Sequence, residues 1–294
     1  MILNANIVGS RKTRTAVMAA VTALLVTACT QQGSESAEVA SSAGEENPFG
    51  HVHGLALDPG TDQLLLATHN GLFDISGESP EKIGPTNDLM GFATADAGRY
   101  YASGHPGSGS DLPNPLGLVE STDGGQTWQE LSRQGESDFH ALTVSQEGVI
   151  GFDGTLRMTT DGQEWIEASD QIQPVNLAAS TDGPVVLATT EDGVQRSDDG
   201  GATWELPEGA PVLLITAFAD ADTAVGVAPD GTAHVSRDAG KSWETTGGIT
   251  GQPSAVAAST DGEDGLQIWV ATEQGIEFSD DAGATFSTTI PAGQ

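Results

Sequence analysis

Histidine is scarce in this chain, and most of its copies lie in one part of the sequence. The chain has 294 residues and 6 histidines, five of which fall between residues 51 and 140. These five are His51, His53, His69, His105 and His140. Imidazole nitrogens are common ligands of transition metals, and five that meet in a fold are too many for a routine core. We therefore expect these histidines to bind a metal ion.

Other side chains near these histidines bear on the same chemistry. The thioether of Met90 favours copper if it coordinates, whereas zinc or another divalent ion is favoured if it does not. Asp88 and Asp138 could be further ligands or acceptors that fix histidine tautomers, and Glu273 is a further candidate. Histidine clusters also serve in pH sensing and general base catalysis, which sequence does not separate from metal binding. We expect no organic cofactor.

A short sequence motif, the repeated phrase, recurs along the chain and predicts the strands and turns that hold these side chains. STDGGQTW at residues 121–128 returns as SDDGGATW at residues 197–204, with weaker copies at residues 159–165, 236–243 and 279–286. The aspartates of the copies are Asp123, Asp161, Asp199, Asp238 and Asp281, spaced 38, 38, 39 and 43 residues apart. This is the period of a four-stranded β-propeller blade. In each copy, aspartate can accept hydrogen bonds from turn amides, glycine permits a positive φ, and the final aromatic side chain is expected to pack between blades.

Six stretches with strand-like alternation predict an all-β, six-bladed propeller over residues 49–294. Inner strands are expected to begin at His53, Met90, His140, Asn176, Thr216 and Ser254. Two residues earlier stand His51, Asp88, Asp138, Pro174, Leu214 and Gln252, and the second strands end near His69, His105, Asp153, Thr190, Pro229 and Glu273. In a propeller these three positions share one end of the central channel. The five histidines are therefore expected to converge at one channel mouth.

Two departures from the repeat concern blades 1 and 2. Blade 1 has no recognisable copy of the phrase, only Phe73-Asp-Ile-Ser76-Gly. Blade 2 carries a Gly/Pro-rich insertion, residues 104–117, beside the expected mouth. Such loops often cover sites, and a plain surface excursion is the alternative.

The repeated phrase resembles the Asp-box, or BNR repeat, of sialidase-type propellers. The Asp-box is a structural turn and does not itself indicate an activity. The segments HVHGLALDP (51–59), ATHNGLF (67–73), ASGHP (102–106) and DFHAL (138–142) resemble a group of bacterial propeller lipoproteins. Members of this group are commonly labelled glycosyl hydrolase-like or sialidase-like, and the resemblance spans essentially all of residues 49–294. It implies a hydrolase activity.

A sialidase needs three clustered arginines, a tyrosine nucleophile paired with glutamate, and an aspartate acid/base. After residue 28 the arginines are Arg99, Arg133, Arg157, Arg196 and Arg237. Arg157 and Arg196 precede copies of the phrase on outer strands. Tyr100 and Tyr101 are expected at the end opposite the histidine mouth, so this arrangement cannot be assembled.

Two other functions remain open at the sequence level. A glycosidase needs only two carboxylates at a suitable separation, which Asp138, Asp153 and Glu273, with Asp88, could supply. A protein-binding scaffold at the cell surface is the third possibility, because propeller faces commonly serve for docking.

The N-terminal part predicts where the protein acts. Residues 1–28 combine a basic start, an apolar run and no acidic residue, which is typical of a lipoprotein signal peptide. VTAC at residues 26–29 resembles a lipobox, and Cys29, the only cysteine, is expected to be lipidated. Residues 29–48 read as a flexible acidic linker. We expect an extracytoplasmic protein, held at the cell membrane by its lipid.

Net charge restricts the partners. The formal net charge is -32, with 42 acidic and 10 basic residues. Nucleic acid is not expected to bind, because phosphate contacts need clustered Lys and Arg. Cations are favoured, and an envelope protein or a glycan is a possible partner. We expect a monomer.

Overall fold

The computed structural model describes residues 49–169, 172–261 and 265–291. The predicted signal peptide, the lipidation site Cys29 and the acidic linker lie outside the described residues and stay predictions. Within the described part of the chain, no helix is long and apolar enough to cross a membrane.

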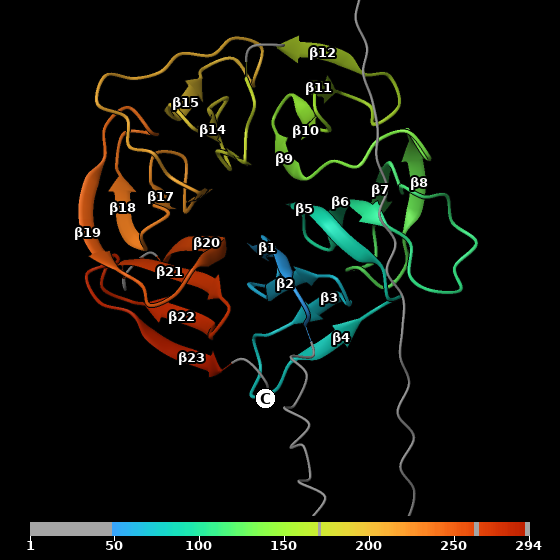
Figure 1. The fold of residues 1–294 in the computed structure, drawn as a ribbon, viewed down its shortest axis with the longest axis horizontal. Helices are drawn as coiled ribbons and strands as arrows, with labels where there is room; N and C mark the ends of the chain where they lie inside the picture. Colours follow the sequence, from blue (N-terminus) through green and yellow to red (C-terminus); the bar gives the residue numbers. More distant parts are fainter. Residues whose placement is uncertain (1–48, 170–171, 262–264, 292–294) are drawn as a thin grey trace, which may run out of the picture. The chain divides into compact units, whose positions relative to one another are not determined.

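The described chain forms six antiparallel sheets that follow one another along the sequence, as a six-bladed propeller requires (Figure 1). Blade 1 has β1 (Val52–Leu57), β2 (Leu64–Thr68), β3 (Gly71–Asp74) and β4 (Glu81–Ile83). Blade 2 has β5 (Asp88–Asp96), β6 (Arg99–His105), β7 (Leu118–Ser121) and β8 (Gln129–Ser132). Blade 3 has β9 (Ala141–Ser145), β10 (Gly148–Phe152), β11 (Leu156–Thr159) and β12 (Ile166–Ser169).

The second half of the chain repeats this pattern with one shorter sheet. Blade 4 has β13 (Asn176–Ala179), β14 (Val186–Thr190) and β15 (Gly193–Ser197). Blade 5 has β16 (Ile215–Phe218), β17 (Ala224–Val227), β18 (Thr232–Ser236) and β19 (Glu244–Gly248), and blade 6 has β20 (Pro253–Asp261), β21 (Gly265–Thr272), β22 (Gly275–Ser279) and β23 (Ser287–Pro291). In blade 4 a single bridge between Arg196 and Glu205 stands in place of a fourth strand.

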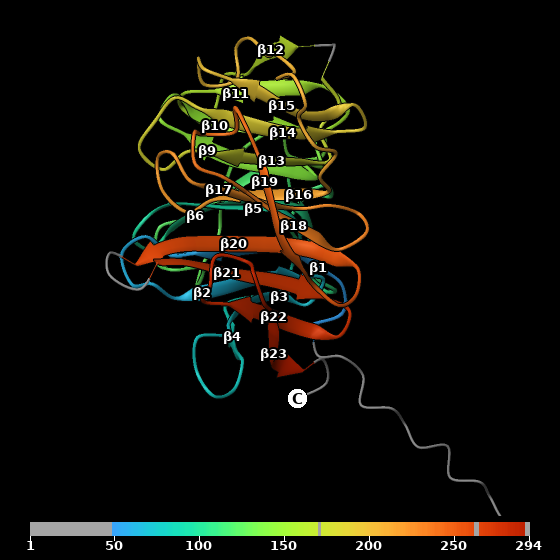
Figure 2. The same ribbon diagram turned by 90° about the vertical axis from the view of Figure 1, so that its left-hand side faces the viewer.

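The first strand of each blade lies nearest the middle of the ring, as β1, β5, β9 and β20 show in Figure 1. From the side, the strands of blade 6 lie in sequence order from β20 to β23 (Figure 2). The prediction of six blades is therefore confirmed. Because neighbouring strands are antiparallel, the start of a first strand and the end of a second strand meet at one end of the channel.

The repeated phrase folds as a turn that hydrogen bonds to itself. At the copy with Asp281, the carboxylate accepts bonds from the amide and hydroxyl of Thr285, at 2.9 and 2.7 Å, and from the hydroxyl of Ser279 at 2.8 Å. The Ser279 hydroxyl in turn accepts the amide of Gly283 at 2.9 Å. The copies at Asp123, Asp199 and Asp238 repeat these contacts. Aspartate and serine thus satisfy amides that the tight turn would leave unpaired.

The aromatic residue that ends each copy packs between its own blade and the preceding one. Trp128 lies against the core shared by blades 1 and 2, and Trp165 stacks on Phe139 between blades 2 and 3, with ring centroids 4.8 Å apart. The next three interfaces between neighbouring blades, here called seams, contain Trp204, Trp243 and Phe286 in that order. Five seams are therefore filled by the repeat itself.

The sixth seam, between blades 6 and 1, closes in a different way. Each of the two sheets is built from one continuous segment, so no strand is exchanged between the chain ends. Phe49, Leu55 and Phe73 pack there against Ala257 and Ile276, with the rings of Phe49 and Phe73 edge to face at 5.2 Å. Among the described residues, side-chain packing therefore closes the ring without a shared strand.

The acids of these turns should make stability depend on pH in a narrow acidic range. Hydrogen bonds from Thr285 and Ser279 lower the pKa of Asp281 to about 2, and similar bonds lower the pKa of Asp123 and Asp199. An unfolded aspartate titrates near pH ~3.9, so this contribution is complete above that pH and is lost as pH falls toward the folded pKa. We expect the urea midpoint to fall between about pH 4 and pH 2. Asp281→Asn should flatten that fall, and an equal fall in this variant would contradict the assignment.

Candidate metal centre

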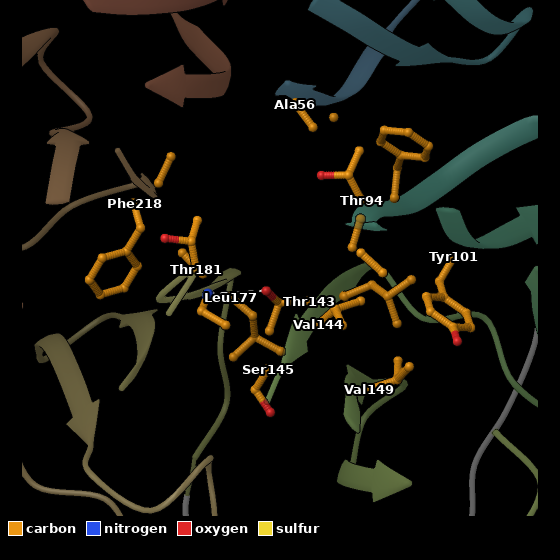
Figure 3. A pocket seen from close by; sticks show the side chains of 18 of the residues that line it. Ala56, Thr94, Tyr101, Thr143, Val144, Ser145, Val149, Leu177, Thr181 and Phe218 are labelled. Atoms are coloured by element: carbon orange, nitrogen blue, oxygen red, sulfur yellow. Dashed lines mark hydrogen bonds between the residues drawn. The ribbon is translucent and has the colours of Figure 1, made fainter. Parts of the chain in front are cut away.

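The channel through the ring is a cavity of about 1020 Å³ whose wall is made by the first strands. All six residues predicted to begin these strands line it: His53, Met90, His140, Asn176, Thr216 and Ser254. Figure 3 shows deeper side chains of the same wall, with Ala56, Thr94 and Thr143 arranged around the open space. Three of the six first positions thus carry metal-binding side chains, all in blades 1 to 3.

Backbone pairing brings residues from both ends of neighbouring strands to this mouth. In blade 1, the His69 amide donates to the carbonyl of His51 at 3.1 Å, just beyond the last pair of β1 and β2. In blade 2, Asp88 at the start of β5 pairs directly with His105 at the end of β6. The register therefore places histidine and aspartate columns side by side on one rim.

One group of these residues surrounds the carboxylate of Asp88. His69 Nδ1 lies 2.7 Å from Asp88 Oδ2, and His53 Nε2 lies 3.5 Å from Asp88 Oδ1. The rings of His53 and His69 meet edge to face, with centroids 4.6 Å apart. We call His53, His69 and Asp88 the first set. Its donor atoms lie within 4.8 Å of one another, the spacing of a group that could hold a metal ion.

His51 extends the first set toward solvent. Its ring centroid is 5.0 Å from that of His69, and its side chain is exposed.

Burial sets the protonation of His53. Its side chain is 17% exposed, and this desolvation lowers its pKa. Asp88 opposes the shift, while His69, His51 and His140 add to it. A lowered pKa keeps the ring neutral at pH 7, the form that binds metals. Among the described residues, His53 Nε2 and Asp88 Oδ1 are both buried without a hydrogen-bond partner, although they face each other.

A second group surrounds Asp138, which lies just before β9. His105 Nε2 is 3.2 Å and His140 Nε2 is 3.6 Å from the same oxygen, Asp138 Oδ2. We call His105, His140 and Asp138 the second set. The structure therefore distributes four of the five histidines over two carboxylates, with His51 beside His69, instead of placing all five around one point.

The insertion at residues 104–117 contributes to the second set. Its Asn114 Oδ1 lies 2.7 Å from His105 Nδ1, and the amide of Gly107 donates to Asn87 Oδ1 at 3.2 Å. The loop is therefore tied to the rim through His105. Asn114 was not among the predicted site residues, because an asparagine in a Gly/Pro-rich loop carries no sequence signal for this contact.

Two of the predicted acids lie apart from the histidines. Asp153 accepts the Ser137 hydroxyl and pairs with Arg157 at 3.2 Å and Arg133 at 3.7 Å. Glu273 is exposed in the turn after β21. Neither acid is within the first or second set, whereas Met90 lines the channel with His53 and His140.

The tyrosines lie at the other end of the channel, as expected. Tyr100 donates its hydroxyl to Asp58 at 2.7 Å, and Asp58 also accepts amides of Gly60 and Gly98. Burial and the Asp58 charge raise the pKa of Tyr100, so this hydroxyl stays protonated. It serves to join blades 1 and 2.

Comparison with known proteins agrees with the fold. The BNR/Asp-box repeat family matches residues 119–130 and 195–206. No curated protein sequence matches the chain. The chain is thus a β-propeller with BNR/Asp-box repeats.

Solved propellers are similar in structure and distant in sequence. The GH74 xyloglucanase from Xanthomonas campestris is 13% identical, with a TM-score of 0.58 over 82% of this chain and 38% of that one. An ancestral GH74 enzyme is 14% identical, with a TM-score of 0.52 and the same coverage. The chain therefore spans about two fifths of the length of these enzymes. Ycf48 bound to a D1 peptide is 20% identical, with a TM-score of 0.44 over 67% of this chain and 64% of that one.

Proposed function

We propose that the protein binds a transition metal ion, zinc or copper, through His53, His69 and Asp88 at the mouth of its channel. One observation carries the proposal. His53 Nε2 and Asp88 Oδ1 are buried, face each other at 3.5 Å and have no hydrogen-bond partner among the described residues. Buried polar atoms without partners are costly, and a bound cation would satisfy both.

The spacing suits a metal. Ligand bonds of about 2.1 Å at tetrahedral angles place two donors about 3.4 Å apart. The His53 and Asp88 donor atoms already have almost this separation, at 3.5 Å. His69 supplies a third donor from the adjacent turn, and three protein ligands leave a position for His51, water or a small ligand.

The ligand types favour zinc over calcium or magnesium. Two imidazoles and one carboxylate are the donors that zinc and copper prefer, whereas calcium and magnesium prefer all-oxygen sites. Met90 lines the same mouth, and its participation would favour copper.

The biological role we propose is handling of a metal ion outside the cytoplasm. The predicted lipid on Cys29 would hold the propeller at the cell membrane, and the linker at residues 30–48 would let it reach a partner there. The large negative charge would raise the local concentration of cations at the surface.

The test is a metal titration of the purified protein and a His53→Gln/His69→Gln variant. We expect zinc or copper binding to weaken by at least about 100-fold in the variant, because two of three ligands are lost. Excess Mg²⁺ should be present throughout, to occupy exposed carboxylates. The matched control is His234→Gln, since His234 lies on β18 outside both sets. Equal affinity in wild type and double variant would refute the proposal.

A further inference from the structure

We propose that His105, His140 and Asp138 form a second metal site, next to the first, so that the channel mouth holds two cations. This inference rests on the proposed function for the choice of metal, but it depends on different residues.

Both histidines of the second set have their Nδ1 atoms engaged by oxygen. His140 Nδ1 lies 3.2 Å from the backbone carbonyl of Asp138, which can only accept a hydrogen bond. His105 Nδ1 lies 2.7 Å from Asn114 Oδ1, also an acceptor. In the neutral ring a proton on Nδ1 leaves Nε2 with a free lone pair. A proton on each Nδ1 would satisfy these two oxygens and leave Nε2 of both rings available to bind a metal.

The Nε2 atoms of both rings lie near the same carboxylate oxygen of Asp138. His105 Nε2 is 3.2 Å and His140 Nε2 is 3.6 Å from Asp138 Oδ2. With both rings neutral and protonated on Nδ1, these three atoms are all acceptors, and a bound cation would relieve their mutual repulsion. Asp138 Oδ1 is buried without a hydrogen-bond partner among the described residues, so the carboxylate has a second unsatisfied atom.

The fold repeats one contact in the two sets. His69 directly follows β2 and His105 ends β6, the second strands of their blades. Asp88 and Asp138 each stand two residues before the first position of the next blade. The pairing of His69 with Asp88, through Nδ1 at 2.7 Å, has a counterpart in that of His105 with Asp138, through Nε2 at 3.2 Å. A rotation by one blade therefore relates the central contact of the first set to that of the second.

The second site should bind more weakly than the first. Among described residues, only the donor atoms of the first set all lie within 4.8 Å of one another. The second set must therefore close around its ion. The His140 side chain is 59% exposed, so we expect this ring to make most of the movement that brings the three donor atoms together.

Zn²⁺ titration of the full chain in excess Mg²⁺ tests the inference by stoichiometry. We expect two Zn²⁺ per wild-type chain, bound in two steps. Asp138→Asn and His140→Gln should each lose the weaker step, with at least about a 100-fold loss of affinity, and keep the tighter one. Asp88→Asn should lose the tighter step, and His234→Gln should keep both. His140→Gln is included because the His140 ring is largely exposed, so its replacement is expected to leave folding unchanged.

Three results would overturn the inference: one Zn²⁺ per wild-type chain, two retained after Asp138→Asn, or both lost together in that variant. The Asp88→Asn measurement separates these from a failure of the first site. Nitrogen NMR of the histidine rings gives a readout that a structural role would not move. The Nε2 resonances of His105 and His140 should shift with the second equivalent of Zn²⁺. A proton on His105 Nε2 before and after titration would refute the proposal.

Discussion

Asp88→Asn should weaken Zn²⁺ binding at the first site by about 100- to 1000-fold, more than any other single substitution at the mouth. Asp88 supplies the only negative charge of the first set, and its two oxygens face two different rings. Asparagine keeps the shape but loses that charge. It also places an amide group where it can donate a hydrogen bond to the free nitrogen of His53, and this bond would occupy a ligand atom.

The measurement is competition with a chromophoric zinc chelator at fixed pH and ionic strength. Asp62→Asn is the matched control, because it removes one negative charge from an exposed residue near the other end of the channel. Asp62 has a φ of 57°, a conformation that asparagine adopts readily. If both variants bind Zn²⁺ equally well, the effect is general electrostatics and Asp88 is not a ligand.

Gly125→Val should be the most destabilising change in the repeated turns, costing about 3 kcal/mol or more. Gly125 has a φ of 85°, which a β-branched residue adopts only with strain. A Cβ there would lie 2.5 Å from Leu72 Cδ2 and 3.2 Å from Ile83 Cγ2, in the core between blades 1 and 2. The added methyl groups would therefore push these blades apart.

Its neighbour offers a control that separates backbone strain from overpacking. Gly124 has a φ of 74°, yet a Cβ there would meet no atom within 4 Å. We expect Gly124→Val to cost only the conformational part, about 1–2 kcal/mol, and Gly125→Val to lower the melting temperature by about 10 °C. Equal losses in the two variants would show that the seam accommodates the extra volume.

The blades could be predicted from sequence because one short turn recurs at a nearly constant spacing. Each copy uses its aspartate and a serine or threonine for local hydrogen bonds and its aromatic residue for packing between blades, so the motif can be recognised in the sequence. Blade 4 shows the limit of this method. Its outer edge is a single bridge beside Arg196, whose buried guanidinium bonds Asp198 at 2.6 and 2.7 Å, and no periodicity indicates this.

The position of the site could also be predicted, but its internal arrangement could not. Strand periodicity assigns His53, His69 and His105 to one rim. Which carboxylate each ring faces depends on side-chain rotation and on contacts from elsewhere in the chain, such as Asn114 with His105. Asp153 shows the same limit. It lies at the end of the second strand of its blade, as His105 does, yet it forms ion pairs with Arg157 and Arg133 and lies outside both sets.

The way the ring closes has a mechanical consequence. Among the described residues, an apolar cluster that includes Phe49 packs blade 1 against blade 6, so tension applied to the chain at Phe49 would act on this interface. Blade 1 also carries His53 and His69, while Asp88 belongs to blade 2. A cation bound by these three residues would cross-link blade 1 to blade 2. Loss of the cation would make blade 1 easier to detach from the ring under tension.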